Sequence, residues 1–97
     1  MKLPIVTFFL AGLSFSAIAA DPVAGKAAAA SCAACHGPQG ISMNPQWPNL
    51  AGQKEAYLVS QLLAFKNGDR KNALMSPMAT SLTEEDIANI SAYFAGL

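Results

Sequence analysis

The C-terminal half of the chain has apolar side chains at the spacing of an α-helix. Between residues 53 and 67 they recur every three or four positions, which predicts a helix with one mainly apolar face. Gly68 is well placed to end this helix. The positions on the face are Tyr57, Leu58, Gln61, Leu62 and Phe65.

A second amphipathic helix is predicted from residue 84 to the end of the sequence. Thr83 is a suitable N-cap and Asp86 stands at the capping-box position, while Glu84 and Glu85 place acidic charge at the positive end of the helix. The expected buried face consists of Ile87, Ile90, Phe94 and Leu97, with Tyr93 beside it.

A third helix is predicted over residues 21–36. Asp21 followed by Pro22 is a typical helix start, and the sequence that follows is rich in alanine, the best helix former. Gly37 can cap the end. Small residues, with Gly25 among them, would let another helix approach closely.

The segments between these helices contain residues that break regular structure. Residues 37–52 include three prolines and three glycines, which predicts a long loop, with Trp47 as its one large anchor. At residues 74–78, Pro77 is expected to prevent a regular helix. No strand pattern and no internal repeat occurs, so the predicted fold class is all-α, with three main helices and connecting loops.

The first residues have the composition of a secretory signal peptide. Lys2 gives a basic start, residues 3–18 are almost wholly apolar, and residues 17–19 form an A-x-A cleavage pattern. We expect a cleaved signal peptide at 1–19, with 1–20 as the close alternative, and one domain at 20–97. The other interpretation is a retained membrane anchor, for which the apolar run is short. Export would place the protein in the periplasm, an oxidising compartment.

The candidate chemistry lies in one pentapeptide, Cys32-Ala-Ala-Cys35-His36. C-x-x-C-H is the attachment motif of a c-type haem, because two thiols at this spacing can add to the two vinyl groups of one porphyrin. The imidazole that follows can then reach the iron, and a proximal histidine is a standard haem ligand. We therefore predict one haem c, attached covalently through Cys32 and Cys35, with His36 as an axial ligand.

Other uses of a cysteine pair are less consistent with this sequence. A zinc site needs about four ligands, and these are the only two cysteines and the only histidine in the chain. A redox pair of the thioredoxin kind should stand beside a βαβ pattern, which is missing. A structural disulfide across so short a loop would contribute little stability.

Size and charge restrict the function further. About 78 residues remain after residue 19, enough for one small domain that is marginally stable by itself. Without Lys2 the six basic residues become five, against six acidic ones, for a formal charge of −1. No basic stripe is present, so nucleic-acid binding is not expected.

Motifs along the mature chain together resemble the small class I c-type cytochromes of bacteria, of the cytochrome c-553 kind, and one half of the di-haem cytochromes c4. The resemblance implies an all-α cytochrome c fold around one haem, and an electron carrier that is not an enzyme. The matching segments are Cys32–Gly37, Trp47–Gln53, Tyr57-Leu58, Gln61-Leu62, Arg70-Lys71, Met75–Met78, Leu82–Ile87 and Ala92–Phe94.

The resemblance also implies roles for further residues. The family's second axial ligand is a methionine seven positions before the leucine that precedes the last helix, which here is Met75, seven before Leu82. Met78 is the alternative and would otherwise pack against the haem. The carbonyl of Pro48 is the expected acceptor for the second ring nitrogen of His36.

Two more side chains are candidates for contact with haem propionates. The indole N–H of Trp47 could donate to one, the other interpretation being simple packing. Arg70 could pair with one through its guanidinium, the other interpretation being a solvated turn.

Competing functions remain open at this point. One is a haem enzyme or gas sensor with an open sixth position, and another is a haem subunit fixed on a larger dehydrogenase or oxidase. For an electron carrier, the expected partners are redox proteins, namely a dehydrogenase, a cytochrome complex or a terminal oxidase or reductase. Whether the chain also pairs with a copy of itself is a separate question.

Overall fold

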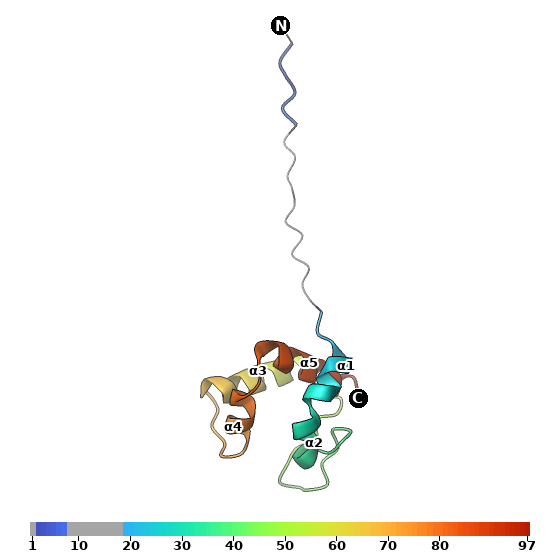
Figure 1. Ribbon diagram of the computed structural model, residues 1–97, viewed down its shortest axis with the longest axis vertical. Helices are drawn as coiled ribbons and strands as arrows, with labels where there is room; N and C mark the ends of the chain where they lie inside the picture. Colours follow the sequence, from blue (N-terminus) through green and yellow to red (C-terminus); the bar gives the residue numbers. More distant parts are fainter. Residues whose placement is uncertain (1, 8–18) are drawn as a thin grey trace.

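Helices are the only regular secondary structure in the part of the chain that the structure describes, residues 2–7 and 19–97 of a computed structural model. Five helices follow one another, and the predicted all-α class is confirmed (Figure 1). They are α1 (Pro22–Ala28), α2 (Ala30–His36), α3 (Glu55–Asn67), α4 (Met75–Thr80) and α5 (Glu84–Ala95). The expected signal peptide falls largely on residues 8–18, which lie outside the described residues. None of the helices described is long and apolar enough to cross a bilayer.

The helix predicted over 21–36 is two helices in the structure. Asp21 caps α1 as expected, its Oδ1 accepting from the backbone of Val23 at 2.9 Å and of Ala24 at 3.3 Å. At Ala29 the backbone departs from helical geometry, with ψ at 2°. Ala29 is also buried in the core. The alanine-rich sequence therefore predicted helix correctly but not its interruption at Ala29, because helix propensity is only a weak preference.

The prediction that Pro77 would prevent a regular helix is wrong. Residues 75–80 form α4, and Pro77 is its third residue. The first turn of a helix has backbone N–H groups without intrahelical partners, so a proline there removes no helical hydrogen bond. The rule against proline applies to helix interiors.

The C-terminal helix α5 begins as its sequence predicts. Thr83 and Asp86 exchange reciprocal hydrogen bonds of 3.0 Å, which is a complete capping box. Ile87, Ile90 and Phe94 are buried. Leu97 is 47% exposed, so the apolar face ends one turn earlier than expected.

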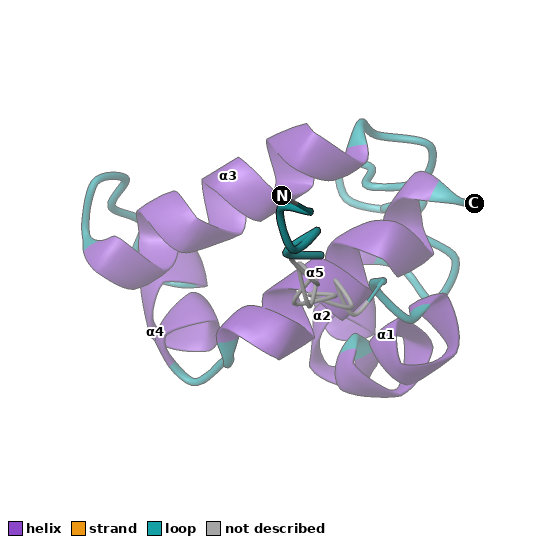
Figure 2. Cartoon of the chain, turned by 90° about the horizontal axis from the view of Figure 1, so that it is seen from above, coloured by secondary structure: helices purple, strands orange, loops and turns teal. Residues whose placement is uncertain are grey.

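The core lies where α1, α3 and α5 meet. Leu58 of α3, Ile90 and Phe94 of α5, and Ala29 form its buried cluster. Figure 2 shows α5 between α3 and the α1–α2 pair. Gly25 lies where α1 crosses α5, and a Cβ there would overlap the backbone carbonyl of Asn89. The close helix approach expected from the small residues of α1 is therefore present.

Candidate functional site

The imidazole of His36 is fixed at the end of α2. His36 is the last residue of the helix and is buried. Gly37 follows with φ of 86°, a conformation that favours glycine. The Nδ1–H donates to the carbonyl oxygen of Pro48 at 2.8 Å, so the hydrogen bond expected with Pro48 is present. This bond occupies one ring nitrogen and leaves Nε2 as the nitrogen able to bind a metal.

The loop that supplies Pro48 is itself anchored at several points. Gly40 accepts backbone hydrogen bonds from Leu50 at 2.8 Å and from Ala51 at 3.0 Å. Ser42 Oγ donates to the carbonyl of Cys35 at 3.2 Å, which links the loop to α2. Gly52 donates to the carbonyl of Phe94 at 2.9 Å, which links the loop to α5. The acceptor of the His36 bond is therefore held by the folded core.

The two cysteines lie on one side of α2. They are three residues apart, which brings their side chains to neighbouring positions on the helix surface. Both are half-buried free thiols. Burial raises the pKa of the Cys32 thiol above its ordinary value, against a smaller lowering by a hydrogen bond with Ser31. The Cys32 thiol therefore ionises less readily than an exposed cysteine.

No other metal site competes with this one among the described residues. Nowhere in that part of the chain do three or more His, Cys, Asp and Glu side chains gather as they would around a metal ion. Two thiols and an imidazole with one free nitrogen suit a porphyrin bound through its vinyl groups and its iron. The donor set therefore fits a covalently attached haem.

Met75 lies at the start of α4 and is half-buried. Helices α2 and α4 extend from the same side of the α3–α5 layer (Figure 1). No Cα atoms of α2 and α4 come within 8 Å of each other, and α4 packs on α3. The structure thus presents an imidazole on α2 and a thioether on α4 from two helices that do not pack together.

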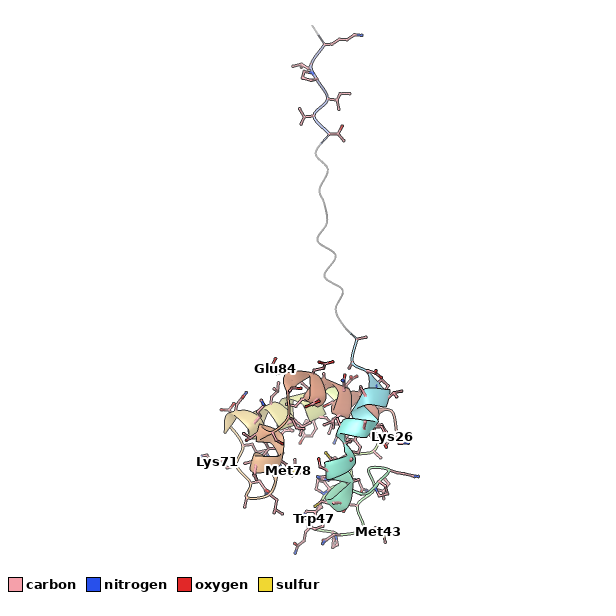
Figure 3. All side chains as sticks on the ribbon, in the orientation of Figure 1. Lys26, Met43, Trp47, Lys71, Met78 and Glu84 are labelled. Atoms are coloured by element: carbon pink, nitrogen blue, oxygen red, sulfur yellow. The ribbon has the colours of Figure 1, made fainter. Side chains whose placement is uncertain are left out.

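The other expected contact residues have varied surroundings. Trp47 is half-buried and lines a shallow hollow beside α2 together with Ala33, Ala34 and Met43. Figure 3 shows Met43 and Trp47 on the loop near α2, and Met78 on α4. Met78 is 38% exposed. The contacts of Trp47 and Met78 with haem stay predictions.

Arg70 is held against α3. Its Nη1 donates to Oε1 of Gln61 at 2.8 Å, and its guanidinium lies 4.6 Å from the centroid of the Phe65 ring. The backbone N–H of Arg70 also donates to the carbonyl of Ala64 at 3.1 Å. These contacts already orient the Arg70 side chain within the protein. The pairing of Arg70 with a haem propionate stays a prediction.

Sequence reasoning missed two residues that contact the Met75 segment. Asn72 Oδ1 accepts hydrogen bonds from the backbone of Leu74 and Met75, each at 2.9 Å. Lys66 Nζ donates to the carbonyls of Thr80 and Leu82. An asparagine before an apolar segment is a helix-cap signal that could have indicated Asn72. Lys66 gave no signal, because its acceptors lie 14 and 16 residues away along the chain.

Comparison with known proteins identifies a family. The family model described as Cytochrome c matches residues 22–97. The chain is 51% identical to cytochrome c4 of Thiocapsa roseopersicina over 76 residues, which covers 77% of this chain and 39% of the relative. It is 46% identical to cytochrome c-554(548) of Halomonas halodenitrificans over 80 residues, covering 79% of this chain and 96% of that protein.

A further relative and a solved structure complete the comparison. The chain is 42% identical to a thiosulfate dehydrogenase electron acceptor of Thiomonas intermedia over 88 residues, covering 89% of this chain and 40% of the relative. The crystal structure of reduced recombinant cytochrome c4 from Pseudomonas stutzeri superimposes with a TM-score of 0.75 at 41% identity, covering 79% of this chain and 45% of that one. The chain therefore spans about half the length, or less, of the cytochromes c4 that it matches. On the extent of these matches, the chain belongs to the cytochrome c family, whose domain holds a covalently bound haem c.

Proposed function

We propose that this chain is a one-electron carrier and not an enzyme. The observation that supports this most strongly is the geometry of His36, which is buried, hydrogen-bonded through Nδ1 to Pro48 and open at Nε2. A histidine held in this way is oriented for one axial position on a haem iron. The bound haem supplies the redox chemistry, with iron alternating between its ferrous and ferric states.

The residues of the chain then have separate tasks. Cys32 and Cys35 would form the two thioethers to the haem vinyl groups, and His36 and Met75 would bind its iron. The carbonyl of Pro48 fixes the ring orientation of His36 and makes its free nitrogen, Nε2, a stronger ligand for a metal. The Met75 sulfur would keep water off the iron and favour its reduced state. With both residues bound to the iron, the protein would exchange electrons without binding a substrate there.

The proposal extends to export. Residues 1–19 would be removed as a signal peptide, with 1–20 as the alternative, leaving the cytochrome c domain at 20–97 in the periplasm. Its partners would be redox proteins such as a dehydrogenase, a cytochrome complex or a terminal oxidase or reductase. The relative from Thiomonas intermedia, described as an electron acceptor of thiosulfate dehydrogenase, favours a dehydrogenase among these.

Intact-mass spectrometry of the exported protein tests attachment and cleavage together. We expect the mass of residues 20–97 plus one haem. Replacing Cys32 or Cys35 with alanine should sharply lower the yield of haem-containing protein. Apoprotein mass with a free or disulfide-linked cysteine pair would refute the haem assignment, and a mass that retains residues 1–19 would refute the cleavage.

Ligand binding separates a carrier from a haem enzyme or gas sensor. With Met75 on the iron, the reduced protein should bind carbon monoxide slowly or not at all, and the ferric protein should resist cyanide. Rapid and complete binding of either ligand would indicate an open sixth position and overturn the carrier proposal. Gel filtration of the native extract distinguishes a free shuttle from a subunit of a larger complex and detects a homodimer.

A further inference from the structure

The helix that contains Met75 packs on α3 but buries little apolar surface of its own. It is six residues long, far too short to be stable by itself. Ala79 is its one buried side chain, while Met78 is 38% exposed and the preceding Leu74 is 59% exposed. Hydrogen bonds to neighbouring segments can therefore add to the packing on α3 in determining where α4 and its methionine lie.

At its N-terminal end, α4 is tied to Asn72. The side-chain Oδ1 of Asn72 accepts from the backbone N–H of Leu74 and of Met75, each at 2.9 Å. In return, the backbone N–H of Asn72 donates to Ser76 Oγ at 3.0 Å. This reciprocal pattern has the logic of a capping box. One of the bonds ends on the backbone of Met75 itself.

At its C-terminal end, α4 is tied to α3 through Lys66. The Nζ of Lys66 donates to the carbonyl of Thr80, the last residue of α4, at 3.3 Å and also to the carbonyl of Leu82. Carbonyls at a helix C-terminus lack intrahelical partners. A cation there is stabilising, because this end of the helix dipole is negative. The ammonium therefore connects α4 and the start of the next segment to the body of the domain.

We propose that Asn72 and Lys66 are positioning residues that hold the Met75 sulfur at the haem iron by fixing the two ends of α4. This inference rests on the proposed function, because it takes Met75 as the axial ligand. With these anchors, the position of the thioether depends on hydrogen bonds to the backbone of its short helix. Without them, α4 moves more freely on α3 and the sulfur leaves the iron more often.

The test uses the haem-containing protein with two single substitutions. Asn72→Ala removes the two side-chain hydrogen bonds, and Lys66→Met keeps an unbranched side chain but removes the ammonium. In each variant, cyanide should bind the ferric protein about five- to thirtyfold faster, the range expected when one or two net hydrogen bonds are lost. The weak far-red absorption band of methionine–ferric iron ligation should also decrease. Asn72→Asp, which keeps the acceptor oxygen, should restore both properties.

Matched controls separate positioning from general loss of stability. Asn44→Ala removes a similar bond in the loop of residues 37–52, where Asn44 Oδ1 accepts from the backbone N–H of Gln46 at 2.9 Å. Lys54→Met alters an exposed lysine at the opposite end of α3. Both controls should bind cyanide at the unmodified rate, and thermal melting of all variants gives their stability.

The outcomes distinguish this inference from the proposed function. If Asn72→Ala and Lys66→Met melt at lower temperature but bind cyanide no faster than the controls, the two residues are merely structural and the inference is overturned. If the unmodified ferric protein lacks the far-red band and binds cyanide at once, the proposed function itself fails. A present band that is insensitive to both substitutions refutes only the positioning role.

Discussion

At the scale of single residues, the two axial candidates differ in how they are held. His36 is buried and its Nδ1 is bound to a carbonyl in an anchored loop, so both the ring orientation and the free nitrogen are determined. Met75 is half-buried on a short helix, and its side chain has rotational freedom that an imidazole lacks. His36 is therefore held more rigidly than Met75. Substitutions near Met75 should reveal most about how the second iron ligand is held.

The first prediction concerns Met75 and Met78. Met75→Ala should open the sixth position, lower the reduction potential and abolish the far-red band, because the thioether stabilises reduced iron. Met78→Ala should keep the band. Because Met78 is 38% exposed, its substitution should cost about 1 kcal/mol of stability, the ordinary effect of a point mutation. Visible spectra and thermal melts of both variants provide the measurement.

The reverse pattern would change the assignment. If Met78→Ala abolishes the band and Met75→Ala preserves it, Met78 is the axial ligand and Met75 a packing residue. The electron-carrier proposal would survive this result, because either methionine can supply the sulfur.

At the scale of helices, the sequence predicted where helices occur better than it predicted where a helix is interrupted. The capping box at Thr83, the helical spacing of Leu58 and Phe65 and the glycine caps are local features, and each has its expected place. The interruption at Ala29, a residue buried in the core, follows from no local pattern in the sequence. The sequence around α4 contains two opposing signals: Pro77, which predicts no regular helix, and Asn72, whose side chain accepts from the backbone of Met75 at the start of the helix.

The motif residues of the site show the same division. The C-x-x-C-H motif predicted the role of His36, and the resemblance predicted Pro48 as its acceptor. The hydrogen bond between them is present. Lys66 could not be named, because its contacts join segments 14 and 16 residues apart. Long-range contacts of a flexible side chain have no periodicity that a sequence pattern could reveal.

The second prediction concerns the crossing of α1 and α5. Gly25→Ala should lower stability by about 1–3 kcal/mol, the usual cost of adding atoms to a tightly packed contact. A Cβ at this position would overlap the Asn89 backbone carbonyl, and backbone cannot move aside as the end of a side chain can. The haem spectrum should be unchanged, because α1 contributes no ligand. Thermal melting of the haem-containing protein measures the difference.

Gly96→Ala is the matched control for this prediction. A Cβ there would come no closer than 3.5 Å to its nearest neighbour, the carbonyl of Ala92, and φ at this residue is −84°. This substitution should therefore be neutral or slightly stabilising, because it restricts the unfolded chain. Equal melting temperatures for the two variants would mean that the helix crossing tolerates a wider separation than the structure has.

At the scale of the whole molecule, the domain has a small core for its number of helices. The buried cluster joins α1, α3 and α5, whereas α2 and α4 extend from it and do not contact each other. A domain of about 78 residues is marginal without an additional link. Haem joined to α2 by two thioethers and to α4 by Met75 would connect the two helices that the protein core leaves separate.

The last prediction follows from this arrangement. Protein of residues 20–97 made without haem attachment should be largely disordered, because short isolated helices are marginal in water and α2 and α4 have no shared core. Circular dichroism should show weak helical signal and no cooperative thermal transition for the apoprotein, and both features for the haem-containing protein. A cooperative transition in the apoprotein would mean that the α1–α3–α5 cluster folds alone. In that case haem would only lock α2 and α4 onto a domain that is already formed.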